Sequence, residues 1–387
     1  MLIYVLMLAV AVIGSNSLLL SPILSDIAND FSTDPVAVVW AITAYNAVTA
    51  ISALLLTRLI DKSGIYVALS LAYSALLVGT IISGVSGNLI TLIIGQSIAG
   101  LGAGVSLPAI YSLAPLLAPS GQESKYVGRV LTGWSVALVL GVPVAAFMSE
   151  VIHWRAAYGF LCLIAAVTLV VLRGAKNDIL QSQPNMNNDA PPSWSLFAPF
   201  KIAGASTLLS MNLLYMASFY GTYSFVGTHL RAAFGVSATE AGYAVFAYGL
   251  GFGLASFADS LIDRIGVRRT STFVFITLTL IYFSMAIDYG TPFPFYLICL
   301  CWGFVNHLGL SAIITMLGEL KTSLTGQLMG MNSVFTYVGG TLGTLAFGAV
   351  YADLGFGALA VTAALLIALL TIVFEFLVRR VRAPHSI

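Results

Sequence analysis

The chain has 387 residues, of which 59% are hydrophobic and only 8% are charged, whereas soluble domains carry about 25% charged residues. This composition argues against a soluble domain and indicates a polytopic membrane protein. The formal net charge of +1 provides no basic surface for nucleic acid, so none is expected as a partner.

Apolar runs long enough to cross about 30 Å of hydrocarbon, roughly 20 residues each, predict the membrane spans. Six runs lie in the first half, at about 2–24, 36–58, 66–87, 89–113, 129–151 and 155–173. Six more lie in the second half, at about 204–228, 239–261, 270–289, 293–317, 325–350 and 355–378. The sequence therefore predicts an all-α membrane protein with 12 transmembrane helices in two six-helix bundles.

One extended polar stretch separates these two sets of runs. It is Gly174–Ser195, rich in Asn, Gln, Ser and Pro, a composition typical of an unpacked linker. We therefore expect an N-terminal bundle at 1–173, a linker at 174–203 and a C-terminal bundle at 204–387. Asp34 followed by Pro35 predicts a helix N-cap and first turn, which fixes the start of the second span.

The distribution of Lys and Arg predicts the orientation, because short cytoplasmic loops collect these residues. With the N-terminus inside, 14 of the 16 Lys and Arg side chains fall on the inner side. Only Arg155 and Arg231 fall outside. Twelve spans with both termini and the linker in the cytoplasm follow from this split.

Two heptapeptides repeat in register, LIDKSGI at Leu59–Ile65 and LIDRIGV at Leu261–Val267. Each lies between the second and third predicted span of its half. A turn glycine permits a tight connection between antiparallel helices, and the carboxylate can meet a helix N-terminus or a basic side chain. A sequence-related pair of six-span halves is typical of transporters built from parallel repeats.

These loops resemble the Gly-x-Leu-Ala-Asp-Arg-x-Gly-Arg-Lys motif of the major facilitator superfamily. The whole chain is similar to the 12-span drug:proton antiporter branch of that superfamily, which includes sugar, purine and drug efflux permeases. The first copy lacks the final basic pair, whereas the second has Arg268 and Arg269 nearby. The resemblance implies a gating role for both loops. The expected gating residues there are Asp61, Lys62, Gly64, Asp263, Arg264, Gly266 and Arg268.

The fifth span is similar to the antiporter motif of the efflux branch. Gly141 and Pro143, followed by Trp154 and Arg155, lie where that motif expects them. Glycine and proline would weaken and bend a membrane helix, so both residues are further gating candidates. In the fourth span, Gln96 replaces the arginine that the family associates with proton coupling, which keeps other coupling routes open.

Polar and aromatic side chains at midspan are expected to form a substrate site between the two halves, because polar groups are costly at that depth. The seventh span presents four of them on one helix face. The expected substrate-binding residues are Asn16, Tyr45, Asn46, Gln96, Asn212, Tyr215, Phe219, Tyr223, Trp302, Asn306, His307 and Asn332. Each has a structural alternative, since a polar group in a membrane helix often only bonds a neighbouring helix, contributing about 0.6 kcal/mol on average.

No Lys or Arg and no deep carboxylate lies at midspan, which argues against phosphate, dicarboxylate or strictly cationic substrates. A sugar, a nucleoside-like solute or an amphipathic metabolite suits the pocket better. His307 is the midspan group that titrates near neutral pH, and it is proposed to couple protons, with Asp259 and Asp26 as further candidates. A neutral His307 bonded to its neighbours is the alternative.

The sequence thus predicts a secondary transporter that works by alternating access, with proton-coupled efflux favoured by the fifth-span motif. The alternative is a facilitator or proton symporter that imports a small metabolite. An enzyme is not expected, because neither a His-Glu-x-x-His nor a Gly-x-Ser-x-Gly motif occurs. No cofactor or metal is expected beyond a proton gradient. The partners are a small-molecule substrate and the lipid bilayer, with a monomer in a bacterial inner membrane.

Overall fold

The computed structural model describes residues 2–56, 58–119, 122–182, 198–258, 264–320 and 325–381, and all regular structure within them is helical. The elements before residue 183 are α1 (Leu2–Leu18), α2 (Leu20–Asp30), α3 (Pro35–Leu55), α4 (Arg58–Gly84), α5 (Leu89–Leu116), α6 (Glu123–Val136), the π-helical η1 (Ala137–Gly141), α7 (Val142–Val151), α8 (Trp154–Gly174) and α9 (Lys176–Ser182). Those after residue 197 are η2 (Pro199–Lys201), α10 (Ala205–Phe234), α11 (Ala238–Ala255), η3 (Ser256–Ala258), α13 (Val267–Met285), α14 (Pro292–Glu319) and α15 (Thr325–Val381).

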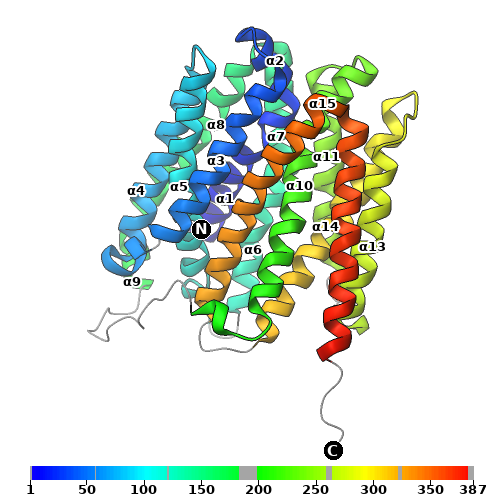
Figure 1. Ribbon diagram of the computed structural model, residues 1–387. Helices are drawn as coiled ribbons and strands as arrows, with labels where there is room; N and C mark the ends of the chain where they lie inside the picture. The colour runs from blue at the N-terminus through cyan, green and yellow to red at the C-terminus, as the bar shows by residue number, and fades with distance from the viewer. Residues whose placement is uncertain are drawn as a thin grey trace, which may run out of the picture.

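The long helices run side by side, with α2 at one end of the bundle and α9 and the last turns of α15 at the opposite end (Figure 1). Helix α10 packs along α15 and also contacts α2, α11 and α14. Helix α3 packs against α5 and α15, and α11 packs against α7 and η1. The helices before and after the polar stretch therefore meet along two lines of contact, one formed by α2 and α3 and the other by α7 and η1.

Side-chain caps fix several helix starts. Asp34 accepts a 2.7 Å hydrogen bond from the backbone nitrogen of Val36, with Pro35 at the first helical position of α3, as the sequence predicts. Asn88 caps α5 by accepting from Thr91, and Ser237 and Glu240 form a capping box at the start of α11.

The first predicted span is broken rather than continuous. Helices α1 and α2 meet at Leu19 with a bend of 48°. Pro22 has no backbone N–H, so it cannot donate to the carbonyl of Leu18 four residues earlier. That carbonyl accepts a hydrogen bond from the Tyr223 hydroxyl at 3.3 Å instead, which ties the break to α10.

The fifth predicted span contains a π turn in place of a sharp kink. The backbone nitrogen of Val142 donates to the carbonyl of Ala137, five residues earlier. A proline removes one α-helical donor and crowds the preceding turn, and a wider π turn relieves both problems. Gly141 and Pro143 therefore widen the helix locally, and the chain continues into α7.

Eight helices in the described part of the chain are long and apolar enough to cross a membrane, or nine when α1 and α2 count as one span. Helix α15 combines the last two predicted spans, with Gly355 at the break (φ 76°, ψ −177°). Helices α10 and α13 are not among the nine. The first carries many buried polar residues, and the second begins with Arg268 and Arg269, which lowers the apolarity of both.

Helices α11 and α14 pack with their backbones in close approach. A Cβ atom at Gly303 would lie 1.9 Å from the carbonyl oxygen of Tyr248, and one at Gly251 would lie 2.0 Å from that of Leu300. Reciprocal glycines of this kind let membrane helices associate tightly. The pair holds Tyr248 and the α14 side chains in a fixed register.

We predict that Gly303→Ala destabilises the protein by about 1–3 kcal/mol, because the added methyl group overlaps a backbone carbonyl. The matched control is Gly318→Ala on the same helix, where nothing lies within 4 Å of the new methyl group. Thermal unfolding in detergent micelles measures both variants. Equal melting temperatures for the two would show that this close approach does not hold the helices together.

Candidate functional site

An aromatic cluster forms where α10, α11, α13 and α14 meet. We define it as Phe219, Tyr223, Tyr248, Tyr282 and Trp302, all buried. The Trp302 ring lies 4.8 Å from Tyr248, 5.6 Å from Phe219 and 5.8 Å from Tyr282 between centroids. Phe219 and Tyr248 stack at 5.6 Å. The spacing of Phe219 and Tyr223 on one face of α10 therefore leads both side chains into a single cluster.

Hydrogen bonds fix the orientation of the cluster. The Asn306 amide donates to the Tyr248 hydroxyl at 2.6 Å, and the Trp302 indole donates to the Tyr282 hydroxyl at 3.2 Å. The Tyr215 hydroxyl donates to the backbone carbonyl of Asn306 at 2.7 Å. These donors are satisfied within the protein, so Tyr215 and Asn306 position the rings.

Gln96 forms a second, neutral hydrogen-bond network. Its carbonyl oxygen accepts from Asn16 at 3.2 Å, and its amide nitrogen donates to Ser83 and Tyr158, each at 3.0 Å. Gln96 and Asn16 are both almost fully buried, at 0% and 1% exposure. Gln96 thus joins α1, α4, α5 and α8 through an amide that carries no charge.

Asn46 lies at the junction of α3, α10 and α15. It is fully buried, and neither its amide nitrogen nor its carbonyl oxygen has a hydrogen-bond partner. A Cβ atom at Gly340 of α15 would lie 3.0 Å from the Asn46 amide nitrogen and 3.0 Å from the Tyr220 ring. Unpaired buried polar atoms are rare, because each costs about 1–3 kcal/mol. Asn46 therefore offers a donor and an acceptor at the contact between early and late helices.

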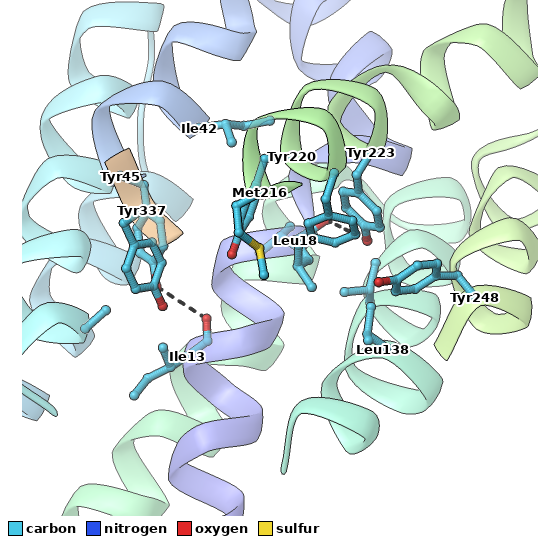
Figure 2. Close-up of a cluster of buried hydrophobic side chains, with 14 of the residues drawn as sticks. Ile13, Leu18, Ile42, Tyr45, Leu138, Met216, Tyr220, Tyr223, Tyr248 and Tyr337 are labelled. Atoms are coloured by element: carbon cyan, nitrogen blue, oxygen red, sulfur yellow. Dashed lines mark hydrogen bonds between the residues drawn. The ribbon is translucent and has the colours of Figure 1, made fainter. Parts of the chain in front are cut away.

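Each of the three helices that meet at Asn46 carries a buried tyrosine, and Figure 2 labels them as Tyr45, Tyr220 and Tyr337. Tyr45 precedes Asn46 on α3, and its hydroxyl donates to the carbonyl of Ile13 at 3.4 Å. Tyr220 lies 5.0 Å from Phe219 between ring centroids, which connects the junction with the aromatic cluster. Tyr337 of α15 is buried beside them. Amide and aromatic groups thus form a continuous path from α3 to α14.

Asn212 and Asn332 lie together on α10 and α15. The Asn212 amide nitrogen donates to the Asn332 carbonyl at 3.2 Å and to the Thr336 hydroxyl at 2.9 Å. The side-chain oxygens of both asparagines are buried without partners. The predicted substrate residues therefore form three groups, around Gln96, around Asn46 with the aromatic cluster, and around Asn212.

His307 adjoins the cluster on α14. Its ring meets the edge of Phe252 with the centroids 4.7 Å apart. The side chain is half-buried, in contrast to Trp302 and Asn306 on the same helix.

The end of the bundle that carries α2 is closed by polar contacts between helices distant in sequence. Asp26 of α2 forms a 2.6 Å ion pair with Arg231 of α10 and accepts a hydrogen bond from Ser149 of α7. Glu150 of α7 accepts a 2.8 Å hydrogen bond from the backbone nitrogen of Thr239 at the start of α11. Asp26, predicted as a proton carrier, is thus part of an outer latch, which we define as Asp26, Arg231, Ser149, Glu150 and Thr239.

The two repeated loops share one backbone feature. Gly64 has φ 80° and ψ 157°, and Gly266 has φ 89° and ψ 134°. Both glycines break the helical backbone at the same place in the repeat, in a conformation that other residues rarely adopt. Arg264 and Arg268 are exposed beside the second glycine. The side chains of Asp61 and Lys62 and the whole of Asp259 and Asp263 lie outside the described part of the chain.

Sequence analysis missed several members of the site. Tyr248 and Tyr282 lie in the eighth and ninth spans, Tyr220 lies one residue from the selected face of α10, and Tyr337 lies in the eleventh span. The regular spacing that identified Phe219 and Tyr223 does not extend to them. A search for hydroxyl-bearing aromatics at midspan in every span would have found these four.

The two buried amides predict opposite stability effects. Gln96→Leu is expected to cost about 1–3 kcal/mol, because Asn16 loses its acceptor. Asn46→Leu, nearly isosteric, is expected to leave stability unchanged or to raise it, because it removes polar atoms that have no partner. Thermal unfolding of the two variants measures this contrast. Equal destabilisation of both would contradict the assignment of Gln96 as paired and Asn46 as unpaired.

The chain is similar to known proteins over most of its length. The family profile of the Major Facilitator Superfamily matches residues 6–225 and 208–387. The MFS-type transporters YwfA and YceJ of Bacillus subtilis (strain 168) are 28% and 23% identical to the chain. Their alignments cover 89% and 88% of this chain, and 84% and 86% of the respective relatives.

Two solved structures share the fold. The human organic anion transporter MFSD10 (TETRAN) superposes with a TM-score of 0.70 at 15% identity, over 96% of this chain and 98% of that one. A D-xylose-proton symporter superposes with a TM-score of 0.73 at 13% identity, over 95% and 96%. The chain is a multi-pass membrane protein of a transporter family rather than an enzyme. It belongs to the major facilitator superfamily.

Proposed function

We propose that the chain is a secondary transporter that carries a small neutral or amphipathic solute by alternating access. The observation that carries this proposal is Asn46, a fully buried amide with both polar atoms unpaired, beside a continuous aromatic wall. A solute with hydroxyl or amide groups would pair with Asn46, and its apolar face would stack on the rings.

The proposed topology has twelve crossings in two six-helix halves, 1–173 and 204–387, with the linker 174–203 and both termini in the cytoplasm. Its support is the count of apolar helices. Nine qualify by composition, the second arm of α15 after Gly355 adds one, and α10 and α13 complete the set. The charge split of 14 to 2 supports the proposed orientation, in which the outer latch lies on the extracellular side.

The solute is proposed to be uncharged at its recognition end, such as a sugar or a nucleoside-like compound. The described residues named in the aromatic cluster and at the Asn46 junction are all neutral. Burying a lone charge among these groups would be expensive, whereas neutral donors and acceptors would be matched.

Export in exchange for protons is the favoured direction, supported by the fifth-span motif and by Asp26. A proton that neutralises Asp26 from outside would weaken its ion pair with Arg231 and release α2 from α10. His307 and Asp259 are the other proposed carriers. The protein is proposed to act as a monomer in the bacterial inner membrane, with a proton gradient as its energy source and no cofactor.

A facilitator or proton symporter that imports a metabolite is the second candidate. It is favoured by Gln96, whose three hydrogen bonds are all to neutral side chains. A network without a cation lacks the usual charged partner for proton coupling. Solute movement that is passive, or coupled through other residues, would be compatible with such a network.

Counterflow in proteoliposomes tests the transport function. Vesicles preloaded with one unlabelled solute are given a trace of the same labelled solute, in a panel of sugars, nucleosides, chelates and drugs at two pH gradients. We expect the labelled form of a neutral or amphipathic solute to accumulate transiently. In Asn46→Leu, this accumulation should be at least tenfold lower when the solute concentration is low. Absence of counterflow for every solute, or counterflow of charged solutes alone, would contradict the proposal.

The outer latch predicts a change in accessibility. Asp26→Asn and Arg231→Gln should each raise the labelling rate of a Ser21→Cys reporter by an outside thiol reagent about 1.4- to fivefold, since a partly exposed ion pair contributes about 0.2–1 kcal/mol. Ser21 is 1% exposed and donates to the carbonyl of Tyr223. The variant that carries both substitutions should show the same labelling rate as each single variant, because either substitution already removes the ion pair.

The matched control for the latch is Asp30→Asn. Asp30 has a similar 2.6 Å ion pair, but with Arg155 of α8 rather than with a helix beyond the linker. All variants use a background without the native cysteines. Equal acceleration by Asp30→Asn would show that the latch does not control this end of the protein.

Proton coupling predicts a separate effect of His307. His307→Gln should abolish the dependence of net transport on the pH gradient while counterflow persists, because exchange of solute needs no titrating group. The control is His153→Asn at the start of α8, where asparagine retains a capping side chain. Unchanged gradient dependence in His307→Gln would remove His307 from the mechanism.

A further inference from the structure

A crevice opens on the side of the protein, away from the aromatic cluster. It has a volume of about 200 Å³ and lies between α1, the segment η1 to α7, and α8. Leu8 and Val12 of α1, Leu140 and Val144, and Phe160 and Ile164 of α8 are among its lining residues. An apolar cavity of about 150 Å³ is already large enough for benzene, so this crevice can hold several methylene groups.

The crevice is apolar and faces the bilayer. Among the described residues that line it, none is charged and Ser15 alone carries a hydroxyl group. Leu140 on its rim is 58% exposed, and Leu163 on the adjoining surface of α8 is 63% exposed. Leu140 and Leu163 belong to the segments Tyr126–Val151 and Trp154–Gly174, which are both apolar enough to cross a membrane. The medium outside the crevice is therefore lipid hydrocarbon.

The floor of the crevice is the π turn. A Cβ atom at Gly141 would lie 2.0 Å from the Ser15 hydroxyl oxygen, so only glycine lets α1 approach this closely. The opposite face of the same turn contacts α11, where a Cβ atom at Gly249 would lie 2.6 Å from the Leu138 side chain. One wall of the crevice is therefore also part of the contact between early and late helices.

We propose that this crevice is a binding site for a lipid acyl chain, which would lie between α1, α7 and α8 beside the π turn. The occupant is a chain from the surrounding bilayer, because the opening faces hydrocarbon and the lining offers no group for a polar ligand. The site is separate from the proposed solute site, since the residues that line the crevice include neither Asn46 nor a member of the aromatic cluster.

Photolabelling tests the proposal without a transport assay. The protein is reconstituted in vesicles of phosphatidylethanolamine and phosphatidylglycerol that contain phosphatidylethanolamine with a diazirine at the middle of one acyl chain. After irradiation, mass spectrometry maps the labelled residues. We expect Leu8, Val144 and Ile164 to be labelled more strongly than Leu163, which contacts only the bulk lipid surface.

Crevice-filling variants sharpen the test. Val144→Phe should reduce crevice labelling to the level of Leu163, because the phenyl ring fills the space that the acyl chain would occupy. Leu8→Phe fills the same space from the opposite wall and replaces Val144→Phe if that variant does not fold. Val167→Phe on the exposed surface of α8 is the matched control and should leave crevice labelling unchanged. Crevice labelling no stronger than that of Leu163, or unaffected by both filling variants, would overturn the proposal.

Discussion

Helix α10 is the constraint on which the rest of the structure depends. Every residue from Tyr215 to Thr228 is buried, so this stretch has no side that faces lipid. A helix buried all round must place its polar groups against other helices, and these groups meet different partners on its different sides. Three residues of α10 make these hydrogen bonds. Tyr223 bonds to Ser21 and Leu18. Asn212 bonds to Asn332, and Tyr215 bonds to Asn306. The outer latch, the Asn46 junction and the aromatic cluster therefore all include residues of this one helix or pack against it.

The hydrogen-bonding groups around α10 differ in how completely they are paired, and the proposed function depends on this difference. On the α14 side, Asn306 donates to the Tyr248 hydroxyl and Trp302 donates to the Tyr282 hydroxyl, so both donors are paired within the protein. On the α3 and α15 side, neither polar atom of the Asn46 side chain has a hydrogen-bond partner, and the side-chain oxygen of Asn212 has none. Fully bonded groups favour a rigid wall, whereas unpaired groups penalise the empty closed state and reward a ligand that supplies the missing bonds. Recognition is accordingly expected where the early and late helices meet.

The sequence predicted the helical class, the N-cap at Asp34, the turn glycines Gly64 and Gly266, and the α10 face that contributes Phe219 and Tyr223. These features depend on local patterns of hydrophobicity, capping and spacing. It could not predict contacts that depend on the packing of distant helices, such as Asp26 with Arg231 or Gln96 with Tyr158, separated by 205 and 62 residues. Nor could it predict the π turn, because a proline pattern is compatible with either a kink or a widened turn.

The central claim is that the early and late helices change their relative position around α10. Pulsed electron paramagnetic resonance between spin labels at Asn29 of α2 and Ala233 of α10, both exposed, tests it most directly. The account predicts two distance populations in vesicles, whose ratio shifts when a counterflow-active solute is added and when Arg231 is replaced by Gln. A single population, unchanged by solute, by external pH and by that substitution, would contradict it.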